Sequence, residues 1–64
     1  MKYREGDIVR ISKKSWCYGF DERRPKDTDG KIVNIIDSRS MRVDWDNGEW
    51  YYFSEDHLKL RRRA

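Results

Sequence analysis

The chain has one cysteine, one proline and no long apolar run, and each of these shortages excludes a class of protein. Because Cys17 stands alone, no disulfide can form within the chain. Cys17 and His57 are two potential zinc ligands where a structural site takes about four, so we expect no metal site. Nothing in the sequence indicates another cofactor, and we expect none.

The sequence also lacks membrane and export signals. No apolar run approaches the ~20 residues that cross a bilayer, and residues 1–7 lack the apolar core of a signal peptide. A lone thiol without an export signal favours a reducing compartment. The expectation is a cytoplasmic protein, monomeric by default, with no membrane partner.

A chain of 64 residues forms one domain, 1–64, with little surface to bury. Domains of this size bury about 60% of the surface that their unfolded chain exposes. Three tryptophans, four tyrosines and two phenylalanines supply most of the apolar area, because each ring buries about 150–250 Å². The aromatic residues therefore have to build much of the core.

The strongest fold signal is an Asp-Asn-Gly sequence that separates two β-type segments. This pattern is typical of a β-hairpin. A two-residue turn would pair Trp45 with Trp50. A three-residue turn, with Gly48 in the left-handed region, would pair Val43 with Tyr51.

The two registers differ in which rings face the core, because a slip of one residue reverses the faces of a strand. We favour the three-residue turn. It buries Tyr51 and Phe53, and it leaves Trp50 and Tyr52 on the outer face. The inner face of the preceding strand then carries Met41, Val43 and Trp45.

The remaining elements are short. Strands are expected at about 7–12, 30–37, 41–46, 49–53 and 58–60, with one 3-10 turn before the last strand. A loop as long as 13–29 is usually functional or disordered. Its aromatic first half, to residue 20, is expected to lie against the body, and its charged second half to be mobile. A basic tail, 61–64, ends the chain.

This order of elements predicts an all-β fold, a single five-stranded SH3-like barrel with a long first loop. Residues 43–48, Phe53 and residues 56–60 resemble the last part of Mind-bomb-type domains. Residues 30–33 resemble a strand of those domains, and Trp16 resembles their first-loop tryptophan. The chain lacks the glycine-rich middle of their first loop and stands without a ligase, so it offers no evidence for ubiquitin chemistry.

A second resemblance is to the group of photosystem I subunit IV and the ferredoxin–thioredoxin reductase variable chain. It is carried by residues 9–11, 15–16 and 53–58, while Tudor and KOW modules share the general plan of strands and turns. Both closer families are non-catalytic modules that bind proteins, so the resemblance implies a docking role. It does not identify a partner, because one fold serves many functions.

Five rings and one acid are the candidates for a partner-binding groove: Trp16, Tyr18, Phe20, Trp50, Tyr52 and Asp44. SH3-like barrels bind peptides against aromatic rings of this kind. The alternative is that most of these rings belong to the core, since so small a domain needs them there. Three acids near the hairpin, Asp44, Asp46 and Glu49, are either a solvated face or, with a neighbouring ring, a cage for a methylated amine.

Basic residues are the candidates for an alternative, nucleic-acid-binding function: Lys13, Lys14, Arg23, Arg24, Lys26, Arg61, Arg62 and Arg63. Single-strand-binding proteins combine such charges with stacking rings. The net charge is +3, from 15 basic and 12 acidic residues, so the same side chains also suit a solubilising surface. Their uneven placement predicts one basic side.

We expect no enzyme, because no catalytic constellation is present. His57 follows Asp56 and Glu55 in one turn, where neighbouring side chains do not face each other, and no activated nucleophile accompanies it. Cys17 is expected to be an inert, half-buried thiol. The sequence therefore predicts a non-enzymatic protein- or peptide-docking module, with nucleic-acid binding as the alternative.

Overall fold

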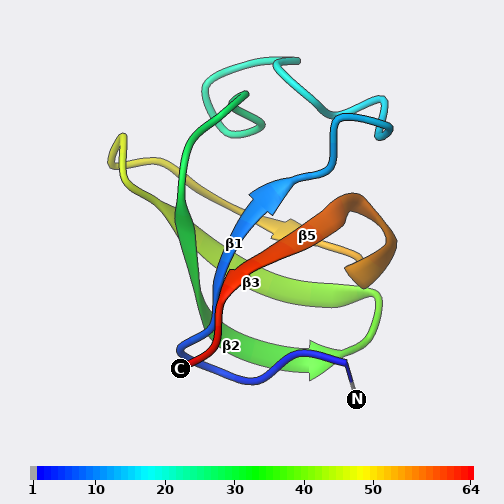
Figure 1. Cartoon of the computed structure of the whole chain (residues 1–64), viewed down its shortest axis with the longest axis vertical. Coiled ribbons are helices and arrows are strands. Elements are labelled where there is room, and N and C mark those ends of the chain that lie inside the picture. Colours follow the sequence, from blue (N-terminus) through cyan, green and yellow to red (C-terminus); the bar gives the residue numbers. More distant parts are fainter. Residues whose placement is uncertain (1) are drawn as a thin grey trace.

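The computed structural model describes residues 2–64, which form five antiparallel strands and one 3-10 turn. In chain order the elements are β1 (Ile8–Ile11), β2 (Gly30–Asp37), β3 (Ser40–Trp45), β4 (Trp50–Phe53), η1 (Glu55–His57) and β5 (Leu58–Arg62). The sheet has the order β4-β3-β2-β1-β5. It curls into a barrel-like body with extents of 25 × 21 × 18 Å (Figure 1). The predicted all-β, five-stranded fold is confirmed.

The last strand is longer than the sequence predicts. A separate basic tail was expected at 61–64, but β5 continues to Arg62, which pairs with Ile8 beyond a register shift. Two interactions hold the chain there. Strand β5 pairs with the backbone of β1, and the Ala64 N–H donates to the Asp7 carboxylate at 2.9 Å. The prediction of a tail is therefore wrong for its first two residues, because backbone pairing outweighs their charge.

The three-residue turn of the β3–β4 hairpin is confirmed. Val43 pairs with Tyr51, as that turn requires. Gly48 has a φ of +90°, and its N–H donates to the Trp45 carbonyl at 3.0 Å. Of the four rings of β4, Phe53 is buried, and Trp50 and Tyr52 are exposed, as expected. Tyr51, which was expected inside with Phe53, is only half-buried.

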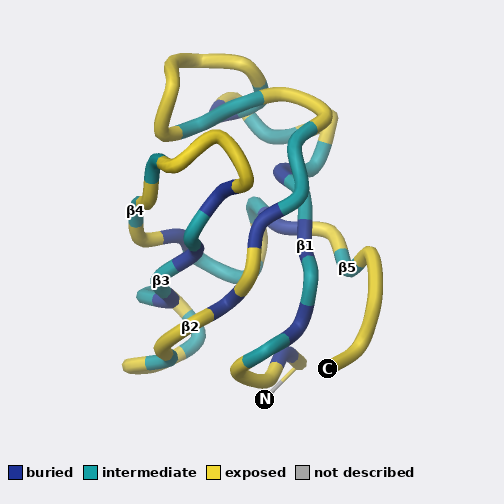
Figure 2. The backbone as a smooth tube through the Cα atoms, turned by 90° about the vertical axis from the view of Figure 1, so that its left-hand side faces the viewer, coloured by how far each residue is buried: buried dark blue, intermediate teal, exposed yellow. Residues whose placement is uncertain are grey.

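The core draws on all five strands, on the segment before β1 and on the long loop. Its members are Tyr3, Val9, Ile11, Cys17, Ile32, Met41, Val43, Trp45, Phe53 and Leu58. Buried and less buried residues alternate along β3, as the two-residue period of a strand demands (Figure 2). Gly30 lies opposite Trp45 in β3, and a β-carbon at this position would overlap the indole ring. The core therefore has room for the indole only because residue 30 has no side chain.

The hairpin holds the second half of the long loop. The Trp45 indole N–H donates to the Arg23 carbonyl at 2.9 Å, and the Asn47 amide donates to the Glu22 carbonyl at the same distance. The Asp46 N–H donates to the Asp29 carbonyl. In each of these hydrogen bonds the loop contributes a main-chain carbonyl oxygen as the acceptor. The side chains of the loop therefore do not predict the contacts. The second half of the loop, which was expected to be mobile because it is highly charged, is thus hydrogen-bonded to the hairpin.

Asp7 joins the two ends of the described chain. It is the one buried charged residue among residues 2–64. Its two carboxylate oxygens accept from the backbone N–H groups of Arg4, at 3.0 Å, and Ala64, at 2.9 Å. The hydrogen bond from Arg4 is the main reason that the pKa of Asp7 lies below its ordinary value, and Ala64 and Arg63 act in the same direction. The carboxylate is therefore ionised in the folded protein and holds β5 beside β1.

Trp45→Ala should be the most destabilising of the tryptophan substitutions. It empties a core position and releases the loop carbonyl, and large-to-small changes of this kind cost about 3–5 kcal/mol. Trp50→Ala is the matched control, because its ring is 45% exposed. Urea denaturation followed by circular dichroism measures both. If Trp45→Ala lies within about 1 kcal/mol of the wild type, the assigned role of the indole is wrong.

Gly48→Ala should cost about 1–2 kcal/mol, because a β-carbon is disfavoured at positive φ. No atom lies within 4 Å of the position that the added carbon would take, so the cost comes from the backbone alone. Gly48→Asn should cost less, since asparagine tolerates the left-handed region. The same denaturation assay compares the two variants. Equal stability of Gly48→Ala and wild type would argue against the turn.

Acid should destabilise the protein partly through Asp7. A pKa below the ordinary 3.8 in the folded state means that ionised Asp7 stabilises the fold above that pH, and that the contribution is lost as the pH falls through the folded-state pKa. Asp29 acts in the same direction, because its hydrogen bond with the Arg10 side chain lowers its pKa. Asp7→Asn should therefore be less stable near neutral pH but lose less stability between about pH 7 and about pH 3. Parallel stability curves for variant and wild type, from denaturation at each pH, would contradict this.

Candidate functional site

Two rings of the long loop stand out from the surface. Trp16 is 66% exposed and Phe20 is 62% exposed, and they meet edge to face with centroids 5.5 Å apart. Successive turns shape this segment, and Cys17 between the rings is buried in the core. The buried thiol anchors the segment, so that its neighbours are presented outward. Exposed rings of this size are unusual in a domain with so little apolar surface to spare.

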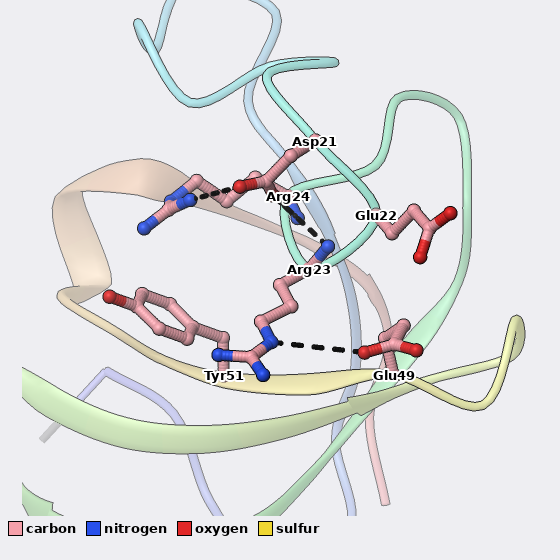
Figure 3. Close-up of a pocket in the computed structure, with 6 residues that line it drawn as sticks. All are labelled: Asp21, Glu22, Arg23, Arg24, Glu49 and Tyr51. Carbon is pink, nitrogen blue, oxygen red and sulfur yellow. Dashed lines mark hydrogen bonds and ion pairs between the residues drawn. The ribbon is translucent and has the colours of Figure 1, made fainter.

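Arg24 lies among three rings. Its guanidinium carbon is 4.4 Å from the centroid of Tyr51, 5.2 Å from that of Phe20 and 5.8 Å from that of Trp16. Asp21 balances the charge through an ion pair at 2.5 Å, which the close-up shows beside the ring of Tyr51 (Figure 3). Arg24 is only 16% exposed. It belongs to this aromatic cluster, so its predicted role as a phosphate contact is not supported by its position.

A small hollow opens beside the cluster. Its volume is about 170 Å³. We call it the aromatic hollow, and it is lined by Trp16, Cys17, Arg24, Tyr51, Tyr52, Phe53, Ser54 and His57. The lining combines the first half of the loop with β4 and the turn that follows it. Segments distant in sequence therefore form one concave surface.

His57 holds the loop against the turn. Its Nδ1 is 2.8 Å from the Ser15 hydroxyl, and its carbonyl accepts from the Ser12 N–H at 2.8 Å. Its ring also meets Trp16 edge to face, with centroids 6.2 Å apart. Within residues 2–64 no carboxylate forms a hydrogen bond or ion pair with His57. The serine–histidine contact therefore lacks the third group that orients a catalytic base, and it positions the tryptophan.

The outer face of the hairpin carries a second group. The Arg42 guanidinium lies 4.1 Å from the centroid of Trp50 and forms an ion pair with Asp44 at 2.9 Å. Trp50 meets Tyr52 edge to face at 5.8 Å. Asp44 is thus engaged by a neighbouring side chain, and one face of Trp50 is covered. The chain's own arginine occupies the place that a methylated amine would need.

The sequence candidates divide among these places. Trp16 and Tyr52 line the aromatic hollow, and Phe20 packs on Trp16. Trp50 and Asp44 lie outside it, on the outer face. The sequence had no signal for Arg24, Tyr51 and His57 as lining residues, because their roles depend on contacts between distant segments.

Tyr18 is half-buried and points its hydroxyl toward the loop, where it donates to Asp27 at 2.8 Å. This hydrogen bond is the main cause that raises the pKa of Tyr18. It does not line the hollow. Its position indicates a role inside the loop.

The basic candidates do not form one surface. Arg23 lies 3.8 Å from Glu49, beside a charged depression that also includes Glu22 (Figure 3). Arg63 lies 3.7 Å from Asp7, the residue directly before β1. Arg62 belongs to β5, and Lys26 is an exposed loop residue. Three of the predicted residues do share one groove: Lys13, Lys14 and Arg61.

Two further observations concern residues 2–64. Their histidine, cysteine and carboxylate side chains nowhere gather in a group of three that could hold a metal ion. No helix in this described part of the chain is long and apolar enough to span a bilayer.

Neither a protein-family model, nor a curated protein, nor a solved structure matches the chain.

Proposed function

We propose that the protein is a non-enzymatic docking module, and that its aromatic hollow binds an extended segment of another protein. The observation that carries this proposal is the exposure of Trp16 and Phe20 at the edge of a concave, ring-lined surface. A short chain gains stability by burying its rings. Keeping two of them in solvent, on a loop tied down at several points, is a cost that a binding role explains.

The size of the hollow favours a peptide over a small molecule. Sites for drug-sized ligands have volumes of about 300–1,000 Å³, whereas the aromatic hollow measures about 170 Å³. It accommodates one apolar side chain between Trp16 and Tyr52. The rest of an extended peptide would lie across the exposed rings, as peptides do on other aromatic-lined grooves.

The hollow is also held in shape before any partner arrives. Arg24 connects the loop to Tyr51 of β4, and His57 connects the loop to the turn η1. Binding to a surface that is already ordered loses less conformational entropy. A rigid, partly apolar surface of this kind suits docking, and no group in it is arranged for bond-making chemistry.

Trp16→Ala should weaken docking strongly and leave the fold intact. Anchor residues at interfaces often contribute about 2 kcal/mol or more, which corresponds to about a thirty-fold loss of affinity. The probe is a set of linear peptides selected on the wild-type protein from a random display library. Isothermal titration calorimetry measures each peptide against wild type, Trp16→Ala and Tyr52→Ala, and thermal unfolding verifies that the variants fold.

Trp50→Ala is the matched control, because Trp50 is an exposed tryptophan outside the hollow. The selected peptides should bind this variant with little change. Peptides that bind Trp16→Ala as tightly as wild type would contradict the proposal. So would a library that yields no peptide with a dissociation constant below about 1 mM.

A further inference from the structure

A second groove lies at the start of the long loop, and positive side chains dominate it. Its volume is about 460 Å³. We call it the lysine groove, and it is lined by Arg10, Ile11, Ser12, Lys13, Lys14, Asp27, Lys59 and Arg61. It shares no lining residue with the aromatic hollow. Strands β1 and β5 bring Arg10, Lys59 and Arg61 to the same place, since Arg10 pairs directly with Lys59.

Internal ion pairs neutralise only part of this charge. Asp29 accepts a hydrogen bond from Arg10 at 2.6 Å and lies 3.8 Å from Arg61. Asp27 accepts from the hydroxyl of Tyr18. In the described chain, residues 2–64, three lysines of the groove take part in no ion pair: Lys13, Lys14 and Lys59. All three are exposed, so an excess of positive charge faces the groove.

We propose that the lysine groove binds the sugar–phosphate backbone of a single-stranded nucleic acid. Successive phosphate groups are ligands that a cluster of unpaired lysines attracts, with release of counterions. The surface is concave, whereas proteins that read a duplex insert a helix or a β-ribbon into its major groove. A groove of this form admits one extended strand. Since the proposed contacts are to phosphate groups, which every nucleotide has, binding should depend little on the base sequence.

The first test is the salt dependence of binding. The probe is a fluorescein-labelled thymidine oligomer of about 12 nucleotides, titrated by fluorescence anisotropy between about 50 mM and about 200 mM salt. Each single-strand phosphate contact contributes about 0.7 to the slope of log affinity against log salt. The triple substitution Lys13→Gln, Lys14→Gln and Lys59→Gln should flatten the slope by about 2 and weaken binding at least ten-fold.

A matched variant separates the groove from general charge. Lys2→Gln, Lys31→Gln and Arg39→Gln remove the same net charge from exposed residues that do not line the groove. This control should bind the oligomer with nearly the slope of wild type. If the two triple variants lose affinity equally, the groove assignment is wrong. The assignment also fails if the wild type shows no binding at about 50 mM salt.

Asp27→Asn is a gain-of-affinity test. Asp27 has a φ of 51°, a conformation that asparagine adopts as readily as aspartate, and the amide oxygen can still accept from Tyr18. The substitution removes one negative charge from the groove without enlarging it. Binding of the oligomer should tighten by about two- to five-fold at low salt. Unchanged affinity would mean that the phosphates lie elsewhere.

Two competitors and one second assay complete the design. Vesicles of phosphatidylserine or a polyglutamate peptide that displace the oligomer at equal charge concentration would overturn the nucleic-acid assignment, as would tighter binding of the matching duplex. The peptides selected on the aromatic hollow should bind the lysine variants normally, and Trp16→Ala should bind the oligomer normally. Failure of one site is therefore distinguishable from failure of the other.

Discussion

The structure depends on the indole of Trp45, which belongs to the core and anchors the long loop at the same time. Its ring meets Phe53 edge to face at 5.4 Å and lies against the backbone of Gly30. Its N–H reaches out of the core to the Arg23 carbonyl. A buried indole needs a hydrogen-bond acceptor, and the loop supplies it. The requirement of one side chain thus helps to fix the second half of the long loop, together with the hydrogen bonds from Asn47 and Asp46.

Arginine contacts with aromatic rings extend this organisation to the surface. Arg24 joins the loop to β4 through Tyr51, and Arg42 covers Trp50 on the outer face. Such contacts contribute about 0.5–2 kcal/mol each, the larger values applying where the cation is shielded from water. In a domain of 64 residues, that is a substantial share of the stability that natural domains possess. The contacts of Arg24 also connect the exposed rings of Trp16 and Phe20 to Tyr51 of β4.

The start of the loop separates the two candidate binding surfaces. Ser12 and Ser15 are both bonded to His57, so the chain between them is held against the turn η1. Lys13 and Lys14 line the lysine groove, and Trp16, two residues after Lys14, lines the aromatic hollow. Each surface has its own lining, and its own chemistry follows from the residues there. The two proposed ligands, a protein segment and a nucleic-acid strand, would therefore contact different side chains.

The strands and the hairpin were predictable from local patterns. The alternation of residues 41–45, the β-branched runs and the Asp-Asn-Gly turn each act over a few residues, and a period of two determines which side faces inward. The confirmed register between Val43 and Tyr51 is one result. The exposure of Trp50 and Tyr52 follows from the same rule. A register shifted by one residue would turn these two rings toward the core and Phe53 away from it.

Tertiary structure alone decided the rest. The hairpin holds the second half of the loop through the main-chain carbonyls of Glu22, Arg23 and Asp29. Every residue has such a carbonyl, so the side chains of the loop do not predict these contacts. Arg24 looks like any other basic residue until the fold places three rings around it. Arg61 joins Lys13 in one groove because β5 pairs with β1, a contact between opposite ends of the chain. Local sequence thus determined the elements and their faces, whereas long-range pairing determined which charges and rings became neighbours.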